Sequence, residues 1–215
     1  MMVVKQKCVE MEFVACGKFV YDKGLTDKEV VYVETLAGIK TLKLNIKEGK
    51  VKTIQVDMGE PILEAKQVPV VSDNEEVIDE PIYISEVDAT YNMTCVSMGN
   101  PHAVVFMDDV DNLAIEKIGP YFENHVRFPN RTNTEFVKVL DRNNVQMRVW
   151  ERGTGETLAC GTGCCATAVA CILNGHTEDE VTVHVLGGKI KIFWDRESNL
   201  IYMTGPAETV FEGEI

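Results

Sequence analysis

The chain has 215 residues, of which 45% are hydrophobic and 26% are charged, and its formal net charge at pH 7 is −13. This length is sufficient for one large domain or two small ones with a substantial core. The acidic balance, with no basic stripe in the sequence, excludes a general binder of nucleic acid. No apolar run reaches the roughly 18 residues that a membrane span requires, so we expect no membrane partner.

The cysteine pattern predicts a reducing compartment. There are seven cysteines, an odd number, and Cys164 and Cys165 are adjacent, which does not suit a secreted disulfide framework. The first eight residues are not followed by the hydrophobic segment of a signal peptide, so the expected location is the cytoplasm. The sequence has no Cys-x-x-Cys pair, and its four histidines lack the spacing of metal ligands, so we expect no metal site.

Hydrophobic periodicity predicts many strands and about two long helices. A helix near the start of the chain precedes strands at residues 30–33 and 50–56, and an acidic, breaker-rich stretch at residues 68–81 divides the chain. The elements predicted after this stretch are strands at residues 91–97, 103–107, 134–139, 145–150 and 181–185 and helices at residues 113–122 and 163–173. The last helix is apolar on all sides, which indicates that a curled sheet encloses it.

The chain contains an internal repeat. Residues 24–44 and 175–192 both read as a strand, a Gly turn and a second strand, with Gly24 matching Gly175. Two copies of one supersecondary unit imply two similar domains related by a pseudo-twofold axis. By this symmetry, roughly 60–70 residues are missing before the helix of the first copy.

We therefore predict an α+β fold of two pseudo-symmetric units, each a curled, mainly antiparallel sheet (a roll or barrel) around a central helix, with the first unit truncated. The predicted domains are residues 1–75, which are incomplete, and residues 76–215, whose last strand can cross back to the first domain. This interpretation requires that residues 18–61 superpose on residues 175–215.

Residues 149–166 are the most informative stretch of the sequence. Glu151 and Arg152 end a strand, a Gly-rich turn follows, and Cys160 precedes the apolar helix. The first amides of a helix are unpaired and its dipole is positive there, so this end binds carboxylates and favours a thiolate. A thiolate beside an anion-binding turn suits acid/base chemistry at the Cα of an amino acid.

Four spaced motifs carry a resemblance to a known family. They are Gly-Asn-Pro-His at residues 99–102, Arg-Thr-Asn-Thr-Glu-Phe at residues 131–136, Glu-Arg-Gly-x-Gly-Glu-Thr at residues 151–157 and Cys-Gly-Thr-Gly at residues 160–163. In this order they resemble the diaminopimelate epimerases, which are amino-acid epimerases that need no cofactor. The match extends to the C-terminus and includes residues 18–28 and 34–40, whereas residues 1–15 do not match.

The resemblance implies a two-base mechanism, in which one thiolate removes the Cα proton and a second thiol returns a proton from the opposite face. Cys160 is the implied catalytic residue, and His102 and Glu151 are implied to influence the protonation of its thiol. The residues implied to bind substrate are Asn100, Asn133, Glu151, Arg152, Gly161 and Thr162. The implied substrate is diaminopimelate, interconverted between its LL and meso forms in the biosynthesis of lysine and peptidoglycan precursors. The resemblance implies no cofactor and a homodimer.

The sequence departs from the family at the second thiol. The family places that thiol in a Cys-Gly-Asn-like turn, whereas the internal repeat pairs Cys160 with Val9. Cys8 is one position off and is not followed by glycine, and Cys16 lies about two helical turns further on. We therefore expect little or no epimerase activity from the 215 residues. Two alternatives stay open, namely a catalytically dead fragment with a residual half-site and a related racemase for proline-like substrates.

Overall fold

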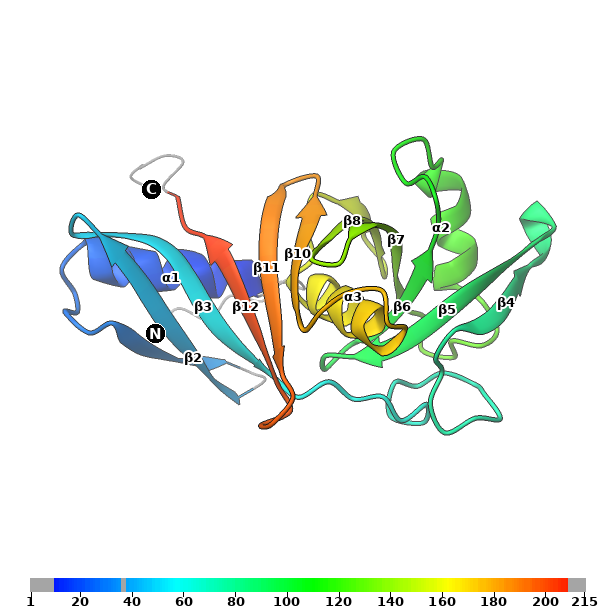
Figure 1. The fold of residues 1–215 in the computed structure, drawn as a ribbon, viewed down its shortest axis with the longest axis horizontal. Helices are drawn as coiled ribbons and strands as arrows, with labels where there is room; N and C mark the ends of the chain where they lie inside the picture. Colours follow the sequence, from blue (N-terminus) through cyan, green and yellow to red (C-terminus); the bar gives the residue numbers. More distant parts are fainter. Residues whose placement is uncertain (1–9, 36–37, 209–215) are drawn as a thin grey trace.

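The computed structural model of the protein describes residues 10–35 and 38–208 (Figure 1). In chain order the elements are α1 (Glu10–Asp22), β1 (Val30–Thr35), β2 (Gly38–Lys47), β3 (Lys50–Gly59), β4 (Glu80–Ile84), a 3-10 helix (Ser85–Val87), β5 (Ala89–Ser97), β6 (Pro101–Phe106), α2 (Ile115–Glu123), β7 (Asn133–Asp141), β8 (Asn144–Glu151), β9 (Gly155–Thr157), α3 (Gly161–Leu173), β10 (Glu180–Val185), β11 (Gly188–Asp195) and β12 (Leu200–Pro206). None of these helices is long and apolar enough to cross a membrane.

One continuous sheet contains all the described strands. Its order is β1-β2-β3-β12-β11-β10-β8-β7-β6-β5-β4, and β9 pairs with β8. Neighbouring strands are antiparallel except for β6 with β7 and β8 with β10, which are parallel. Parallel neighbours need a long crossover connection. Helices α2 and α3 lie in these two connections, so the topology itself brings both helices to the sheet.

Helix α3 lies inside the curl of this sheet (Figure 1). Residues 161–171 are all buried, and the helix packs against strands β5–β8 and β10–β12. Its sequence offers no polar face to water, because it consists of Gly, Ala, Thr, Cys, Val, Ile and Leu residues. The prediction that a curled sheet encloses this helix is confirmed, as is the α+β fold class.

Helix α1 packs against β2 and β3. At Gly17 the helix approaches the sheet closely, because a Cβ placed there would lie 3.0 Å from Ile54 Cδ1 and 3.1 Å from Leu42 Cδ1. The atoms that such a Cβ would meet are the ends of flexible side chains on β2 and β3.

The repeat predicted from the sequence is visible in the order and register of the elements. Helices α1 and α3 both have 13 residues, and their first residues are 151 positions apart. Each is followed by a glycine at φ +70°, Gly24 and Gly175, and then by an antiparallel hairpin. The pairs Thr35↔Gly38 and Val185↔Gly188 close the two hairpins in the same register.

The two halves of the chain share strands. Strand β12 pairs with β3 and also with β11, so it joins the sheet of the first half to that of the second. Within the described residues, the first half has no counterparts of β4–β8 around α1. The division into domains at residue 75 stays a prediction.

The stretch at residues 68–81 is packed against the second half of the molecule. Val68, Val70 and Val77 are buried in a core cluster that also contains Phe122 and Phe136. The Arg127 side chain holds the end of the stretch, since it donates to the carbonyl oxygens of Val71 and Pro81 and to the Glu80 carboxylate. The acidic residues between these points are mostly exposed, as a solvated turn requires.

Helix α2 covers the outside of the sheet over β7, β8 and β9. Its close approach depends on Gly119, because a Cβ at this position would lie 2.4 Å from Trp150 Cδ2. The indole of Trp150 also donates from Nε1 to Glu123 at 2.7 Å. Helix α2 is thereby fixed against the strand that ends at Glu151.

We expect Gly119→Ala to lower the free energy of unfolding by about 1 kcal/mol. The methyl group would overlap the rigid indole ring, an overpacking cost of about 1–3 kcal/mol that exceeds the gain of about 1 kcal/mol in helix propensity. Gly17→Ala is the matched control, since its Cβ would meet only the ends of flexible side chains. Urea denaturation measures both, and equal stabilities for the two variants would contradict this packing.

Candidate active site

Cys160 is the N-cap of α3. Its backbone is extended, with φ −132° and ψ 115°, and its carbonyl oxygen accepts the amide of Cys164 at 2.9 Å. The amides of Gly161 and Thr162 follow in the first turn, where a helix has no internal acceptors for its N–H groups. The Cys160 side chain is buried with only 2% of the residue exposed. A thiol and helix-terminal amides therefore share one enclosed position.

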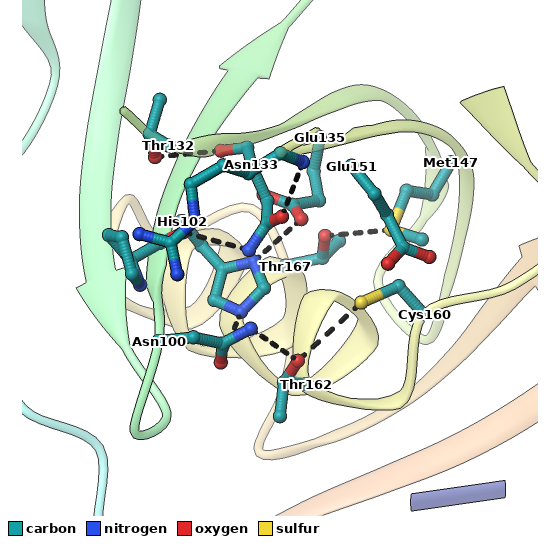
Figure 2. A network of polar contacts seen from close by, with 12 residues as sticks. Asn100, His102, Thr132, Asn133, Glu135, Met147, Glu151, Cys160, Thr162 and Thr167 are labelled. Carbon is teal, nitrogen blue, oxygen red and sulfur yellow. Dashed lines mark hydrogen bonds and ion pairs between the residues drawn. The ribbon is translucent and has the colours of Figure 1, made fainter. Parts of the chain in front are cut away.

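A chain of hydrogen bonds leads from Cys160 into the core (Figure 2). Cys160 Sγ lies 3.5 Å from Thr162 Oγ1, and Asn100 Nδ2 donates to the same hydroxyl oxygen at 3.3 Å. Asn100 Oδ1 lies 3.0 Å from His102 Nε2. On the other side of the ring, His102 Nδ1 lies 2.7 Å from Glu135 Oε1. Five side chains from three parts of the sequence are thus connected.

His102 and Glu135 form a fully buried pair. Both side chains have 0% exposure, and they lie on β6 and β7, which are neighbours in parallel register. Burial raises the pKa of the Glu135 carboxyl, and the adjacent His102 opposes that shift. The carboxyl also requires a glycine at position 163, because a Cβ there would lie 2.7 Å from Glu135 Oε1.

Glu151 ends β8 and is buried beside this cluster (Figure 2). Its Oε1 accepts the Thr157 hydroxyl at 2.5 Å. Thr157 ends the short strand β9, which pairs back on β8 and shapes the Gly-rich turn before Cys160. The carboxylate is therefore held in place by the turn that delivers the thiol.

Asn133 connects two of the predicted substrate-binding segments. Its Oδ1 accepts the backbone amide of Arg152 at 2.9 Å, and its Nδ2 donates to the carbonyl oxygen of Pro101 at 3.0 Å. The Arg152 guanidinium donates to the carbonyl oxygen of Asn130 at 2.9 Å. In this structure both polar groups of the Asn133 side chain are occupied by backbone, which fixes the positions of Arg152 and of the turn before His102.

Glu123, which the sequence did not single out, organises the same region from outside. Its carboxylate accepts Arg131 Nη1 at 2.9 Å, the Gly153 amide at 2.8 Å and Trp150 Nε1 at 2.7 Å. One side chain at the end of α2 therefore holds both the segment before Asn133 and the turn after Arg152. Arg131 adopts φ +57°, a conformation that side-chain-bearing residues rarely take.

The structure gathers the residues that the sequence predicted. Hydrogen bonds connect Cys160, Thr162, Asn100 and His102 directly, and Asn133 connects Arg152 to the same turn. Their functional roles stay predictions. Val9 and Cys8, the candidates for the position opposite Cys160, lie outside the described residues. No group of three or more His, Cys, Asp or Glu suited to a metal ion occurs among residues 10–35 and 38–208.

Comparison with known proteins identifies the family. The family model described as diaminopimelate epimerase matches residues 94–210. The diaminopimelate epimerase of Methanococcus maripaludis is 57% identical over 199 residues, covering 93% of this chain and 71% of the relative. That of Acetivibrio thermocellus is 55% identical, covering 93% and 70%. The chain belongs to the diaminopimelate epimerase family. The resemblance carried by the four motifs is thereby confirmed.

Solved structures with a similar fold extend beyond diaminopimelate epimerases. A hydroxyproline epimerase from Agrobacterium vitis superposes with a TM-score of 0.65 at 13% identity, covering 90% of this chain and 62% of that one. A phenazine biosynthesis protein of the PhzF family from Bacillus anthracis gives 0.61 at 17% identity, covering 90% and 71%. At these identities the likeness establishes the fold alone.

We expect Glu123→Gln to lower the free energy of unfolding by about 2 kcal/mol. The amide nitrogen cannot accept a hydrogen bond, so at least one of three buried or partly buried donors loses its acceptor, at a cost of about 1–3 kcal/mol. Glu178→Gln serves as the control, because Glu178 pairs with Arg142 at a largely exposed site and such pairs contribute about 0–1 kcal/mol. Chemical denaturation that gave both variants the same stability would contradict this role of Glu123.

Proposed function

We propose that this chain supplies the Cys160 face of a cofactor-independent epimerase that interconverts LL- and meso-diaminopimelate. The observation that carries the proposal is the position of Cys160 as the N-cap of α3, next to the amides of Gly161 and Thr162. Membership of the diaminopimelate epimerase family supports the choice of substrate.

The chemistry demands an enclosed and preorganised site, because the Cα–H of an amino acid is a very weak acid. In the proposed reaction the Cys160 thiolate takes this proton while the α-carboxylate, bound at the start of α3, gains charge. Helix amides aimed at that carboxylate stabilise the transition state most where water is excluded. The 2% exposure of Cys160 fits this requirement.

The remaining predicted residues would bind and position the substrate. The amides of Gly161 and Thr162 would hold the α-carboxylate, and Asn100, Asn133 and Arg152 would line the pocket. Glu151 and His102 would influence the protonation of the thiol. Asn133 would also position Arg152, because its Oδ1 accepts the Arg152 amide while its Nδ2 donates to the Pro101 carbonyl oxygen.

Inversion needs a second acid/base on the opposite face of Cα. The residue that the repeat pairs with Cys160 is Val9, which has no ionisable group. A single thiol can remove a proton and return it to the same face, which exchanges hydrogen without changing the configuration. Loss of one acid/base group typically lowers the rate about 10²–10⁴-fold.

We therefore expect Cα deuteration of one diaminopimelate isomer in D₂O, with inversion far slower than ordinary enzyme turnover. The purified chain is incubated separately with LL- and meso-diaminopimelate, and proton NMR follows exchange while chiral chromatography follows inversion. Cys160→Ala should abolish the exchange, and Cys171→Ala, which alters a buried thiol elsewhere in α3, should retain it.

Two results would contradict these expectations. An absence of exchange with both isomers would overturn the proposed function for this chain. Inversion at ordinary enzyme rates that Cys8→Ala abolished would instead show that Cys8 acts as the second thiol.

We also propose a cytoplasmic homodimer whose partner is a small-molecule substrate and not nucleic acid. The net charge of −13 supports the last point. Self-association is supported by β1, which is an edge strand among the described strands and carries Tyr32 with 69% of the residue exposed, because edge strands can pair with another chain. Sedimentation equilibrium measures the oligomeric state.

A further inference from the structure

Glu135 is a buried carboxyl to which the proposed chemistry gives no role. Glu135 is 0% exposed. One oxygen of its carboxyl group contacts His102, and the other, Oε2, has no hydrogen-bond partner among the described residues. Burial of a carboxyl group is costly unless the group is paired. The unpaired oxygen makes burial of Glu135 unfavourable, and the contact of the other oxygen with His102 Nδ1 offsets part of that cost.

The contacts of Asn100 determine where the protons of His102 lie. Asn100 presents its Oδ1 to His102 Nε2 and its Nδ2 to Thr162 Oγ1. An amide oxygen only accepts, so His102 Nε2 must carry a hydrogen. One further proton is then shared between His102 Nδ1 and Glu135 Oε1, and Nε2 keeps its hydrogen whichever partner holds the shared proton.

The next hydrogen bonds, from Asn100 to Thr162 and from Thr162 to the sulfur of Cys160, also run from donor to acceptor toward the thiol. Thr162 Oγ1 accepts from Asn100 Nδ2, which leaves the Thr162 hydroxyl hydrogen available for Cys160 Sγ at 3.5 Å. From His102 Nε2 onward, every donor in this series of hydrogen bonds then points toward the thiol. A hydrogen bond donated to a thiolate favours the charged form.

We propose that Glu135 is a positioning residue that fixes the proton on His102 Nε2 and, through Asn100, directs the Thr162 hydroxyl toward Cys160 Sγ. If Nδ1 of His102 lost its partner, the ring could place its hydrogen on either nitrogen. With the hydrogen on Nδ1, Asn100 would turn its amide to Nε2, and Thr162 would donate to Asn100 in place of the sulfur. The inference concerns the thiol that the proposed function uses, but its test does not require turnover.

Other charged and titratable groups surround the pair. On β8 the group is Glu151. At the start of α3 the groups are Cys160, Cys164 and Cys165. On β5 the group is Cys95, which has Arg127 and Glu80 beyond it. Burial raises the pKa of Cys95, which keeps this neighbouring thiol neutral. Glu151 is therefore the remaining carboxylate that acts on Glu135 directly, and it raises the pKa of Glu135.

The test compares two replacements of similar size. In Glu135→Gln the amide NH₂ can still donate to Nδ1 and hold the hydrogen on Nε2, whereas Glu135→Met offers Nδ1 no strong partner. Nitrogen-15 NMR of labelled histidine, with His102→Gln for assignment, reports which ring nitrogens are protonated. We expect protonated Nε2 in the unmodified protein and in Glu135→Gln, and a mixture of tautomers in Glu135→Met.

Alkylation by iodoacetamide, followed at Cys160 by peptide mass spectrometry across pH, measures the consequence at the thiol. We expect Glu135→Met to slow alkylation at neutral pH about tenfold, the typical effect of a hydrogen bond to a charged group, and Glu135→Gln to slow it less. Cys16, an exposed cysteine, provides the internal reference for the reagent. Glu178→Gln is the control for removal of one carboxylate.

A double-mutant comparison distinguishes an effect of Glu135 that acts through the hydrogen bonds of His102 and Asn100 from a direct effect of its charge on the thiol. In an Asn100→Ala background, Glu135→Met should produce no further slowing, because the connection is already broken. A direct charge effect has the opposite sign, since loss of a nearby carboxylate favours the thiolate. Faster alkylation of Glu135→Met, an unchanged rate, or an unprotonated Nε2 in the unmodified protein would each overturn the inference.

The protonation state of His102 Nε2 in the unmodified protein is measured without any variant at Glu135, so the inference stays testable if Glu135→Met is unstable. Failure of diaminopimelate to exchange its Cα hydrogen would reject the proposed function and leave the tautomer and alkylation results to decide on Glu135.

Discussion

Enclosure of α3 is the constraint on which the rest of the structure depends. A helix that is apolar on every side gains stability only when strands cover it all round, and here seven strands do so. Full enclosure leaves one part of the helix for chemistry, namely its first turn, where unpaired amides remain even when all side chains are buried. The thiol of Cys160 lies at that turn because it is the N-cap residue.

The polar groups around this turn are held by backbone as much as by each other. Parallel pairing of β6 with β7 sets His102 against Asn133 in register and brings Glu135 to the same neighbourhood. Asn133 and Glu123 then bind the amides of Arg152 and Gly153. A buried polar network of this kind is stabilising only when its members are satisfied. The turn after Glu151 is therefore held by side chains from β7 and α2.

Sequence reasoning could recover the parts of the site that local patterns encode. Cys160 is followed by a Gly-Thr-Gly turn and an apolar helix, and Glu151 ends a strand, so both positions follow from neighbouring residues. The helix–hairpin repeat was equally visible, because Gly24 and Gly175 each precede a strand, a Gly turn and a second strand. The fold class and its enclosed helix followed from the same signals.

The residues that sequence reasoning missed are those whose hydrogen-bond partners are far away in the sequence. Glu135 stood in a recognised motif but received no role, because its contact with His102 exists only through the parallel register of two strands. Glu123 carried no signal at all, since its three partners come from two separate turns and a strand. Strands β4 and β9 were not predicted either, because β9 has only three residues and β4 begins within a stretch that reads as a linker.

The pairing of β12 with β3 has a consequence for biosynthesis of the molecule. Strand β3 is synthesised long before its neighbour β12, which is the last of the described strands. Until β12 has left the ribosome, the nascent chain presents β3 as an open edge, and such edges pair readily with other chains. Contacts between residues so distant in sequence also slow folding. The sheet of the first half therefore keeps this edge unpaired until the second half has been made.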